Sequence, residues 1–202
     1  MKKKLPFIIG VVLTIAAAVL YGNTNKTHKI YDNNVNTAVY QGIGILTEDN
    51  TVTQSFTCQE DRLDGFMIKS DISGNYKSAK VNLTVRDAVS GEVVATGVES
   101  GLNIKARKLH YYKIEPITGC YGKKFVLEVS ESGSTVSDGI LLYFQPGESV
   151  EQQELLLNGN SLGGVFVMKT VTERFDVETF LVMVFAEWFI WGFLWFLYRL
   201  FK

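Results

Sequence analysis

One ionisable residue lies inside the most apolar stretch of the chain. Residues 180–198 contain Glu187 as their only charged side chain. Nineteen helical residues would span about 28 Å, which is close to the hydrocarbon thickness of a bilayer. A carboxylate at that depth costs about 2.5 kcal/mol or more unless it is paired, protonated or hydrated. Glu187 therefore predicts a polar contact inside a membrane, either with a partner protein or with Thr14 in the N-terminal apolar segment.

Aromatic side chains surround this acid. Trp191 follows Glu187 at the i+4 position of a helix, and Trp188 and Trp195 lie on the adjoining face. The three tryptophans do not gather at one end of the stretch, as the aromatic belt at a membrane interface would require. We therefore predict that these four side chains dock on another integral membrane protein. A lipid-facing aromatic helix is the alternative.

Residue types suited to catalysis are scarce. The chain contains two histidines, His28 and His110, and it lacks the His-Glu-x-x-His and phosphate-loop patterns. A lone histidine on a strand is more often a surface residue than a general base. We therefore expect a protein that is not an enzyme and that holds no cofactor.

Two small groups of residues could bind metal or form a cross-link. Glu60, Asp61 and Asp64 follow the first predicted strand, and hard oxygen ligands at this spacing suit Ca²⁺. Solvated acids in a surface turn are the alternative. Cys58 and Cys120 could form a disulfide in an oxidising compartment, or remain as buried thiols.

Residues 105–113 interleave basic and aromatic side chains. Such mixtures bind anions, glycans or lipid head groups through charge-assisted hydrogen bonds and stacking. An edge strand whose exposed lysines discourage edge-to-edge pairing is the alternative. We expect no nucleic acid partner, because the domain is net acidic. The candidate contacts for a glycan or anion are Lys105, Arg107, Lys108, Tyr111 and Tyr112.

Charge predicts how the chain is placed in a membrane. An apolar segment follows Lys2, Lys3 and Lys4, and it predicts an uncleaved anchor over residues 1–22, with a cleaved signal peptide as the alternative. Five of the 20 Lys and Arg residues lie at the two chain ends, whereas 20 of the 21 Asp and Glu residues lie between the apolar segments. The positive-inside rule then predicts two spans in the plasma membrane, both termini in the cytoplasm and the main domain outside.

The region between the apolar segments divides into two parts. Residues 23–49 begin polar and Asn-rich, and they predict a stalk and entry segment. Residues 50–173 show period-2 alternation in short segments separated by Gly, Asn and Asp turns, which is typical of an antiparallel β-sandwich. Residues 179–199 complete the chain as the second membrane helix. The predicted strands cover residues 52–58, 65–69, 79–86, 92–96, 109–115, 124–129, 140–144, 155–157 and 164–171.

Several short motifs follow one another in a set order. Gln54-Ser-Phe56 is followed by Leu63-Asp-Gly-Phe-Met-Ile68, by an alternating strand with a Gly-Glu-Val-Val return, and by Gly139 to Tyr143. A Leu-x-Leu-Asn-Gly turn ends at Gly159. Over residues 50–172 this order resembles galactose-binding-like jelly-roll domains of bacterial membrane proteins in surface polysaccharide pathways. The resemblance implies a jelly roll, and it says little about function because jelly rolls have many roles.

These observations predict an all-β extracytoplasmic sandwich (jelly roll) flanked by two transmembrane helices. We expect a non-catalytic accessory subunit of a membrane complex in the synthesis or export of cell-surface glycans or lipid-linked sugars. Its partners would be an integral membrane protein and membrane lipid, with carbohydrate as a further candidate. A membrane-anchored, lectin-like carbohydrate-binding module and a self-assembling structural membrane protein are the alternatives.

Overall fold

The computed structural model describes residues 5–147 and 153–202. The chain forms two compact units. Residues Thr27–Thr172 make up a β unit, and the residues up to Lys26 together with Glu173–Lys202 make up a helical unit.

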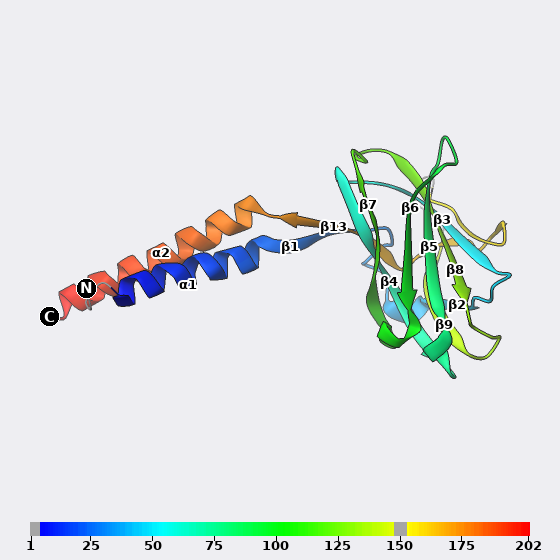
Figure 1. Ribbon diagram of the computed structural model, residues 1–202, viewed down its shortest axis with the longest axis horizontal. Coiled ribbons are helices and arrows are strands. Elements are labelled where there is room, and N and C mark those ends of the chain that lie inside the picture. Colours follow the sequence, from blue (N-terminus) through cyan, green and yellow to red (C-terminus); the bar gives the residue numbers. More distant parts are fainter. Residues whose placement is uncertain (1–4, 148–152) are drawn as a thin grey trace. The chain divides into compact units, whose positions relative to one another are not determined.

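The β unit is a sandwich of two antiparallel sheets (Figure 1). The first sheet has the order β1 (Asn23–Lys29), β13 (Met168–Phe175), β4 (Arg62–Ser73), β9 (Gly139–Pro146) and β12 (Gly164–Phe166), with β2 (Gln41–Ile45) on β9 and β7 (Lys108–Thr118) on β4. The second sheet has the order β11 (Asn160–Ser161), β10 (Leu155–Leu157), β3 (Thr51–Thr57), β8 (Lys124–Ser132), β5 (Lys80–Asp87) and β6 (Val93–Ser100). Short 3₁₀ turns η1, η2 and η3 cover Thr37–Val39, Tyr76–Ser78 and Gly101–Asn103.

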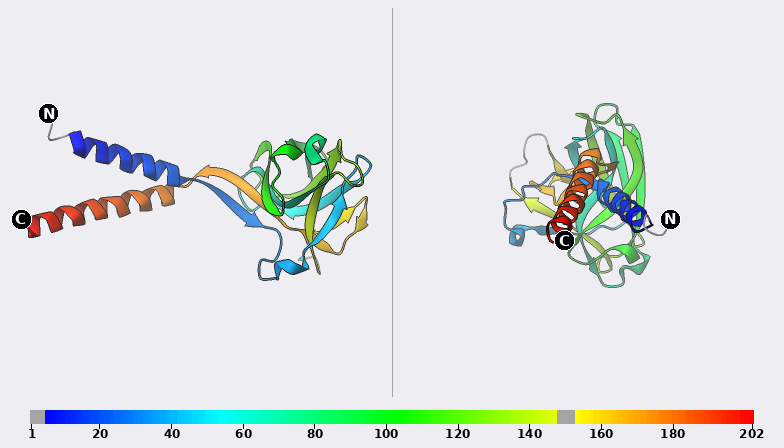
Figure 2. Two further views of the ribbon diagram at one scale, coloured as in Figure 1. Left: turned by 90° about the horizontal axis from the view of Figure 1, so that it is seen from below. Right: turned by 90° about the vertical axis from the view of Figure 1, so that its left-hand side faces the viewer.

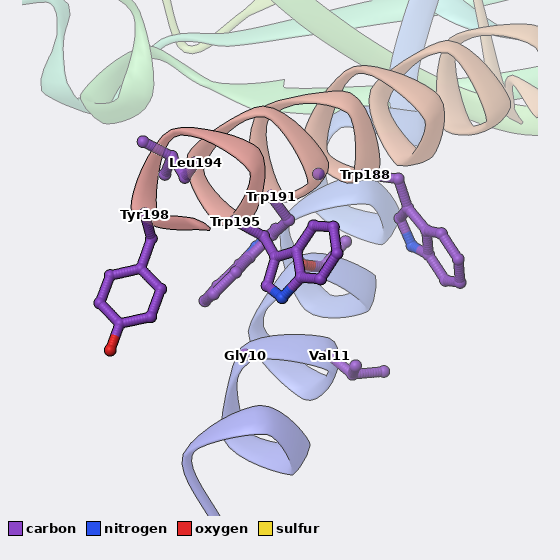
Figure 3. A pocket seen from close by; sticks show the side chains of 9 residues that line it. Gly10, Val11, Trp188, Trp191, Leu194, Trp195 and Tyr198 are labelled. Atoms are coloured by element: carbon purple, nitrogen blue, oxygen red, sulfur yellow. The ribbon is translucent and has the colours of Figure 1, made fainter. Parts of the chain in front are cut away.

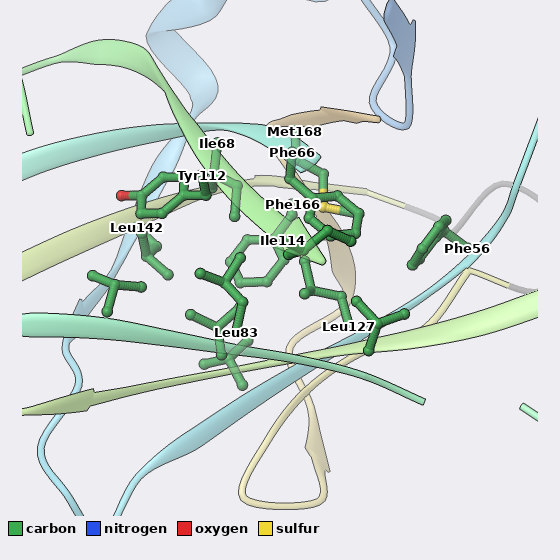
Figure 4. Packing of buried hydrophobic residues seen from close by; sticks show 14 of the residues in the cluster. Phe56, Phe66, Ile68, Leu83, Tyr112, Ile114, Leu127, Leu142, Phe166 and Met168 are labelled. Carbon is green, nitrogen blue, oxygen red and sulfur yellow. The ribbon is translucent and has the colours of Figure 1, made fainter. Parts of the chain in front are cut away.

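The core lies between the two sheets because alternate side chains of each strand point inward (Figure 4). In β5 the predicted alternation is confirmed, since Val81, Leu83 and Val85 are at most 1% exposed. The ring of Phe56 on β3 contacts that of Phe66 on β4 edge-on, with centroids 5.4 Å apart. This aromatic pair joins the two sheets.

A buried amide also joins the sheets. Gln54 on β3 is fully buried, and its Oε1 accepts a hydrogen bond from the backbone N–H of Phe166 on β12 at 2.9 Å. An apolar residue at position 54 would leave that buried N–H without a partner, at a cost of about 1–3 kcal/mol. The glutamine of the Gln-x-Phe motif therefore has a specific structural role.

Residues 23–49, expected as a stalk and entry segment, contribute to the sandwich. They form β1, η1 and β2, and Ile30 and Leu46 are buried in the core. The backbone N–H of Ile30 donates to the carbonyl of Met168 at 3.0 Å. β1 is polar because most of its side chains are exposed while its backbone pairs with β13. The composition therefore predicted exposure correctly, but it could not indicate the pairing.

The helical unit contains α1 (Leu5–Gly22) and α2 (Val177–Leu200). Asp176 caps α2 by accepting hydrogen bonds from the backbone N–H groups of Glu178 and Thr179. Within the described residues, α2 is long and apolar enough to cross a membrane, whereas the apolar part of α1 is the shorter segment Ile9–Gly22. One spanning helix is thus supported, and the second span stays a prediction.

Small residues on every fourth position of α1 face α2. Thr14 and Ala18 are 6% and 0% exposed, and a side chain at Gly22 would lie 2.7 Å from the ring of Phe175. Small residues let two helix backbones approach closely, as in membrane helix pairs. The two helices are closest at the ends that join the strands, and they separate toward the chain ends (Figure 2). The space between α1 and α2 for bulky side chains therefore increases toward the chain ends.

Candidate functional site

The helix pair encloses an apolar groove of about 550 Å³ where α1 and α2 separate (Figure 3). The indole of Trp191 lies across α1 at Gly10, where an added Cβ would be 3.0 Å from Trp191 Cζ2. Glycine at this position is therefore what lets the indole pack. The groove is lined by Gly10, Val11, Thr14, Trp188, Trp191, Gly192, Leu194, Trp195 and Tyr198.

Glu187 lies at an adjoining depression of about 300 Å³. Its side chain is half-buried, and Thr14, Ala17 and Trp191 line the same depression. Within residues 5–147 and 153–202, Glu187 has no hydrogen bond or ion pair, although Thr14 lies nearby. Of the predicted docking residues, Trp191 borders both hollows, Glu187 lines only the depression, and Trp188 and Trp195 line only the groove.

Basic side chains lie at the far end of this aromatic surface. The guanidinium of Arg199 lies 5.6 Å from the ring centre of Trp195, and the ammonium of Lys202 lies 5.6 Å from that of Tyr198. Such long side chains extend their charged ends toward water or lipid head groups while their stems cover apolar surface. The site thus combines an apolar groove, one acid in the adjoining depression, and two cations beside aromatic rings at its end.

The basic and aromatic residues of 105–113 do not form one surface. Tyr112 is fully buried, and its hydroxyl hydrogen-bonds to that of Ser70 at 2.7 Å. The prediction that Tyr112 contacts a glycan or anion is therefore wrong, because strand alternation turns it into the core. Tyr111 points to the other face and donates to the carbonyl of Asp64. Lys105, Arg107 and Lys108 are exposed.

Two of the three predicted calcium ligands make other side-chain contacts. Both carboxylate oxygens of Asp64 accept from Arg62, and Glu60 lies 2.7 Å from Nε2 of His28. In the part of the chain that the structure describes, no group of three His, Cys, Asp or Glu side chains is arranged to hold a metal ion. Calcium at Glu60, Asp61 and Asp64 therefore stays an untested prediction, and an arginine compensates the most buried of these carboxylates, Asp64.

The sequence analysis missed a cluster of three tyrosines around a lysine on the outer face of the first sheet. The ammonium of Lys69 lies 5.3 Å and 5.5 Å from the ring centres of Tyr40 and Tyr143, and Tyr31 contacts Tyr40 edge-on. We call Tyr31, Tyr40, Tyr143 and Lys69 the tyrosine cluster. Outward alternation identifies Tyr143 and Lys69 from sequence, but nothing local indicates that the chain before β2 returns to them.

A carboxylate shared by two donors borders the tyrosine cluster. Oδ2 of Asp71 accepts from the hydroxyl of Tyr143 at 3.1 Å and from Nε of Arg107 at 3.3 Å. Burial, followed by the hydrogen bond to Asp71, raises the pKa of Tyr143 above its usual range. Arg107 has a positive φ of 59°, which is uncommon for a residue with a side chain. This backbone conformation holds the exposed guanidinium beside Asp71.

The two cysteines lie side by side. Cys58 follows β3 and Cys120 lies between β7 and β8, and their sulfur atoms are 3.0 Å apart in the protein interior. The structure has both residues as thiols.

Comparisons with known proteins give a distant likeness in fold. No protein-family model matches the chain. No curated protein matches it. A structure of the clostridial cysteine protease Cwp84 after propeptide cleavage is similar with a TM-score of 0.40 and 13% identity, over 74% of this chain and 40% of that chain. A structure of the cysteine protease and lectin-like domains of Cwp84, a surface layer associated protein of Clostridium difficile, has a TM-score of 0.36 and 12% identity, over 69% of this chain and 37% of that chain. This chain therefore spans less than half the length of either one.

Proposed function

We propose that this chain is a non-catalytic accessory subunit in the plasma membrane that docks on a transmembrane helix of an integral membrane partner. The observation that carries the proposal is the half-buried carboxyl group of Glu187, which has no partner among the described residues and borders an apolar aromatic groove. A carboxyl group inside a membrane needs a hydrogen-bond donor or a positive charge beside it. The groove offers a helix the apolar surface that would bring the donor to it.

Charge complementarity defines the chemistry of the partner. Between residues 180 and 198 Glu187 is the only charged residue, and residues 5–22 contain none. A positively charged donor at the same depth must therefore come from another molecule. We propose a partner helix that presents Lys, Arg, His or a hydroxyl group to Glu187, since such groups pair with intramembrane carboxylates.

The proposed topology has α1 as a second span, both termini in the cytoplasm and the sandwich outside. Its support is the basic charge at both chain ends and the acidic excess between them. The resemblance to jelly rolls of surface polysaccharide pathways suggests that the complex makes or exports cell-surface glycans or lipid-linked sugars. In this assignment the sandwich contributes contacts outside the membrane, and the helix pair contributes the docking surface.

A photo-crosslinking experiment tests the docking surface. The full chain in native membranes would carry p-benzoylphenylalanine at position 195, inside the groove, or at position 189, which is outside it on the same helix. We expect position 195 to crosslink to a transmembrane helix that carries a basic or hydroxyl residue. Glu187→Leu should lower that yield about tenfold or more, and Glu187→Gln should lower it less, because an amide keeps one hydrogen bond.

Three outcomes would contradict the proposal. They are an unchanged yield in Glu187→Leu, equal crosslinking from positions 189 and 195, and crosslinks to lipid only. A crosslink to a second copy of this chain would instead favour the self-assembling membrane protein and overturn the accessory subunit.

Carbohydrate binding is a second candidate function, and the tyrosine cluster is the observation that favours it. Aromatic faces stack against the C–H groups of sugar rings, while Asp71 and Arg107 can bind sugar hydroxyl groups or an acidic substituent. The surface differs from the one that the sequence predicted, since Tyr112 is replaced by Tyr143 and its neighbours.

The full chain in detergent, applied to an array of bacterial surface polysaccharides, tests this second function. We expect saccharide binding that Asp71→Ala and Tyr143→Ala each weaken about tenfold or more, because each change removes a contact to a charged or polar group. Tyr121→Ala is the matched control, since Tyr121 is an exposed tyrosine in the turn between β7 and β8 and is not a member of the cluster. Absence of binding, or equal loss in Tyr121→Ala, would refute the lectin-like function.

A further inference from the structure

We propose that Cys58 and Cys120 form a structural disulfide. This bond would fix the loop between β3 and β4, and contacts from this loop and from the start of β4 hold β1 and β13. The sulfur atoms of the two cysteines are 3.0 Å apart although the residues are 62 positions apart in the chain. A disulfide bond is about 2.05 Å long, so the two atoms need to move about 1 Å to bond. The inference rests on the proposed placement of the sandwich outside the cytoplasm.

Backbone hydrogen bonds already hold the two cysteine segments together. The N–H of Cys58 donates to the carbonyl of Lys123 at 2.9 Å, and the N–H of Gly122 donates to the carbonyl of Cys58 at 2.9 Å. The N–H of Cys120 donates to the carbonyl of Asp61 at 3.2 Å. The segments are thus in register without the sulfur atoms, and bond formation needs little backbone movement.

The effect of this cross-link on the rest of the fold depends on the loop between β3 and β4. Its Glu60 binds His28 of β1 at 2.7 Å, and the carbonyl of Arg62, at the start of β4, accepts from the hydroxyl of Thr172 on β13. In the chain β1 directly follows α1, and β13 precedes α2. A bond at Cys58 therefore fixes the loop that binds β1 and that leads directly into the start of β4, which binds β13.

The chemistry is a two-electron oxidation. The two thiols lose two protons and two electrons, and a sulfur–sulfur bond forms between Cys58 and Cys120. The electrons pass through a mixed disulfide to the disulfide of an exported thiol oxidase, which becomes a dithiol. Such oxidants act in extracytoplasmic compartments.

Burial indicates that the bond is structural and not exchangeable. Cys58 and Cys120 are 2% and 0% exposed. Burial also raises the pKa of the Cys120 thiol to about 12, so little thiolate is present in the folded chain. Oxidation must therefore occur while the chain folds, and reductants should reach the finished bond only after unfolding.

Thiol counting on the full chain in native membranes tests the inference. Chains dissolved in sodium dodecyl sulfate should accept no maleimide-polyethylene glycol before reduction and two after reduction. Cys58→Ser should accept one label without reduction. Dithiothreitol should reduce the folded wild-type chain about 100-fold more slowly than the denatured chain, since both sulfur atoms are buried.

A second preparation separates this inference from the proposed topology. The full chain would be refolded from denaturant in a glutathione redox buffer and labelled in the same way. Free thiols in both preparations, or rapid reduction of the folded chain, would overturn the disulfide. A bond after refolding with free thiols in native membranes would uphold the pairing and overturn the extracytoplasmic placement.

Discussion

Replacing Glu131 by glutamine is expected to stabilise the β unit by up to about 3 kcal/mol at pH 8 and to change its stability little at pH 4. Glu131 is 1% exposed, and burial raises its pKa from 4.5 to about 7. The backbone N–H of Ile140 donates to Oε2 at 3.1 Å and offsets part of this effect. Among the described residues Oε1 has no hydrogen-bond partner.

Burial opposes the ionisation of Glu131, and a second glutamate and a histidine lie on the same inner face. Glu131 on β8 and Glu99 on β6 pair with the same residue of β5, Val81, so all three face the interior from one sheet. From β7 of the other sheet, His110 brings Nε2 to 3.8 Å from Glu99, and Tyr112 is buried among them. Burial, with smaller contributions from both glutamates, raises the pKa of Tyr112 above its usual range. A second negative charge here would therefore be poorly compensated.

The sign of the pH dependence follows from the raised pKa. The folded state binds the proton of Glu131 more tightly than the unfolded state, so this group contributes its full stability below pH 4.5. That contribution is lost as the pH rises through about 7. Glutamine has the same shape without the charge, so the variant should keep its stability at pH 8.

Chemical unfolding of the full chain in detergent, followed by near-ultraviolet circular dichroism, measures the effect. Glu128→Gln is the matched control, because Glu128 lies on the same strand, faces outward and pairs with Arg86 at 3.1 Å. A partly exposed pair contributes about 0–1 kcal/mol, so the control should lose little stability. An equal effect of Glu131→Gln at pH 4 and pH 8 would contradict the pKa assigned to Glu131.

Most strands of the sandwich could be predicted because their information is local. The alternation of Val81, Leu83 and Val85 and the turn before Val93 predict β5 and its return, and the structure confirms both. β1 and β2 could not be found in this way. β1 is polar and depends on β13 for its pairing, about 140 residues later in the chain.

The candidate sites also differ in whether local sequence information determines them. Helical spacing is local, so Glu187 and Trp191 could be placed near one another, and the structure has both lining the same depression. The roles of Tyr112 and Asp64 depended on which face of a strand points inward and on a neighbouring arginine. The tyrosine cluster depended on a long return of the chain to β9. Composition and spacing carry no information on this long return of the chain.

Oxidation of Cys58 and Cys120 is expected to raise the free energy of unfolding of the β unit by about 4 kcal/mol, the largest single effect predicted for this chain. The bond would close a loop of 62 residues, and a loop of that length removes much of the conformational freedom of the unfolded chain. The native state should contribute little strain, because backbone hydrogen bonds already hold the two segments in register.

Equilibrium unfolding of the full chain in detergent, with and without prior reduction under denaturing conditions, gives this difference directly. The Cys58→Ser/Cys120→Ser double variant is the control, because reduction should leave its unfolding midpoint unchanged. The reduced wild-type chain should unfold at a lower denaturant concentration with a steeper dependence on denaturant, since its unfolded state is more expanded. Equal midpoints for the oxidised and reduced wild-type chains would show that the cross-link adds no stability, and the loop that holds β1 and β13 would then depend on its hydrogen bonds alone.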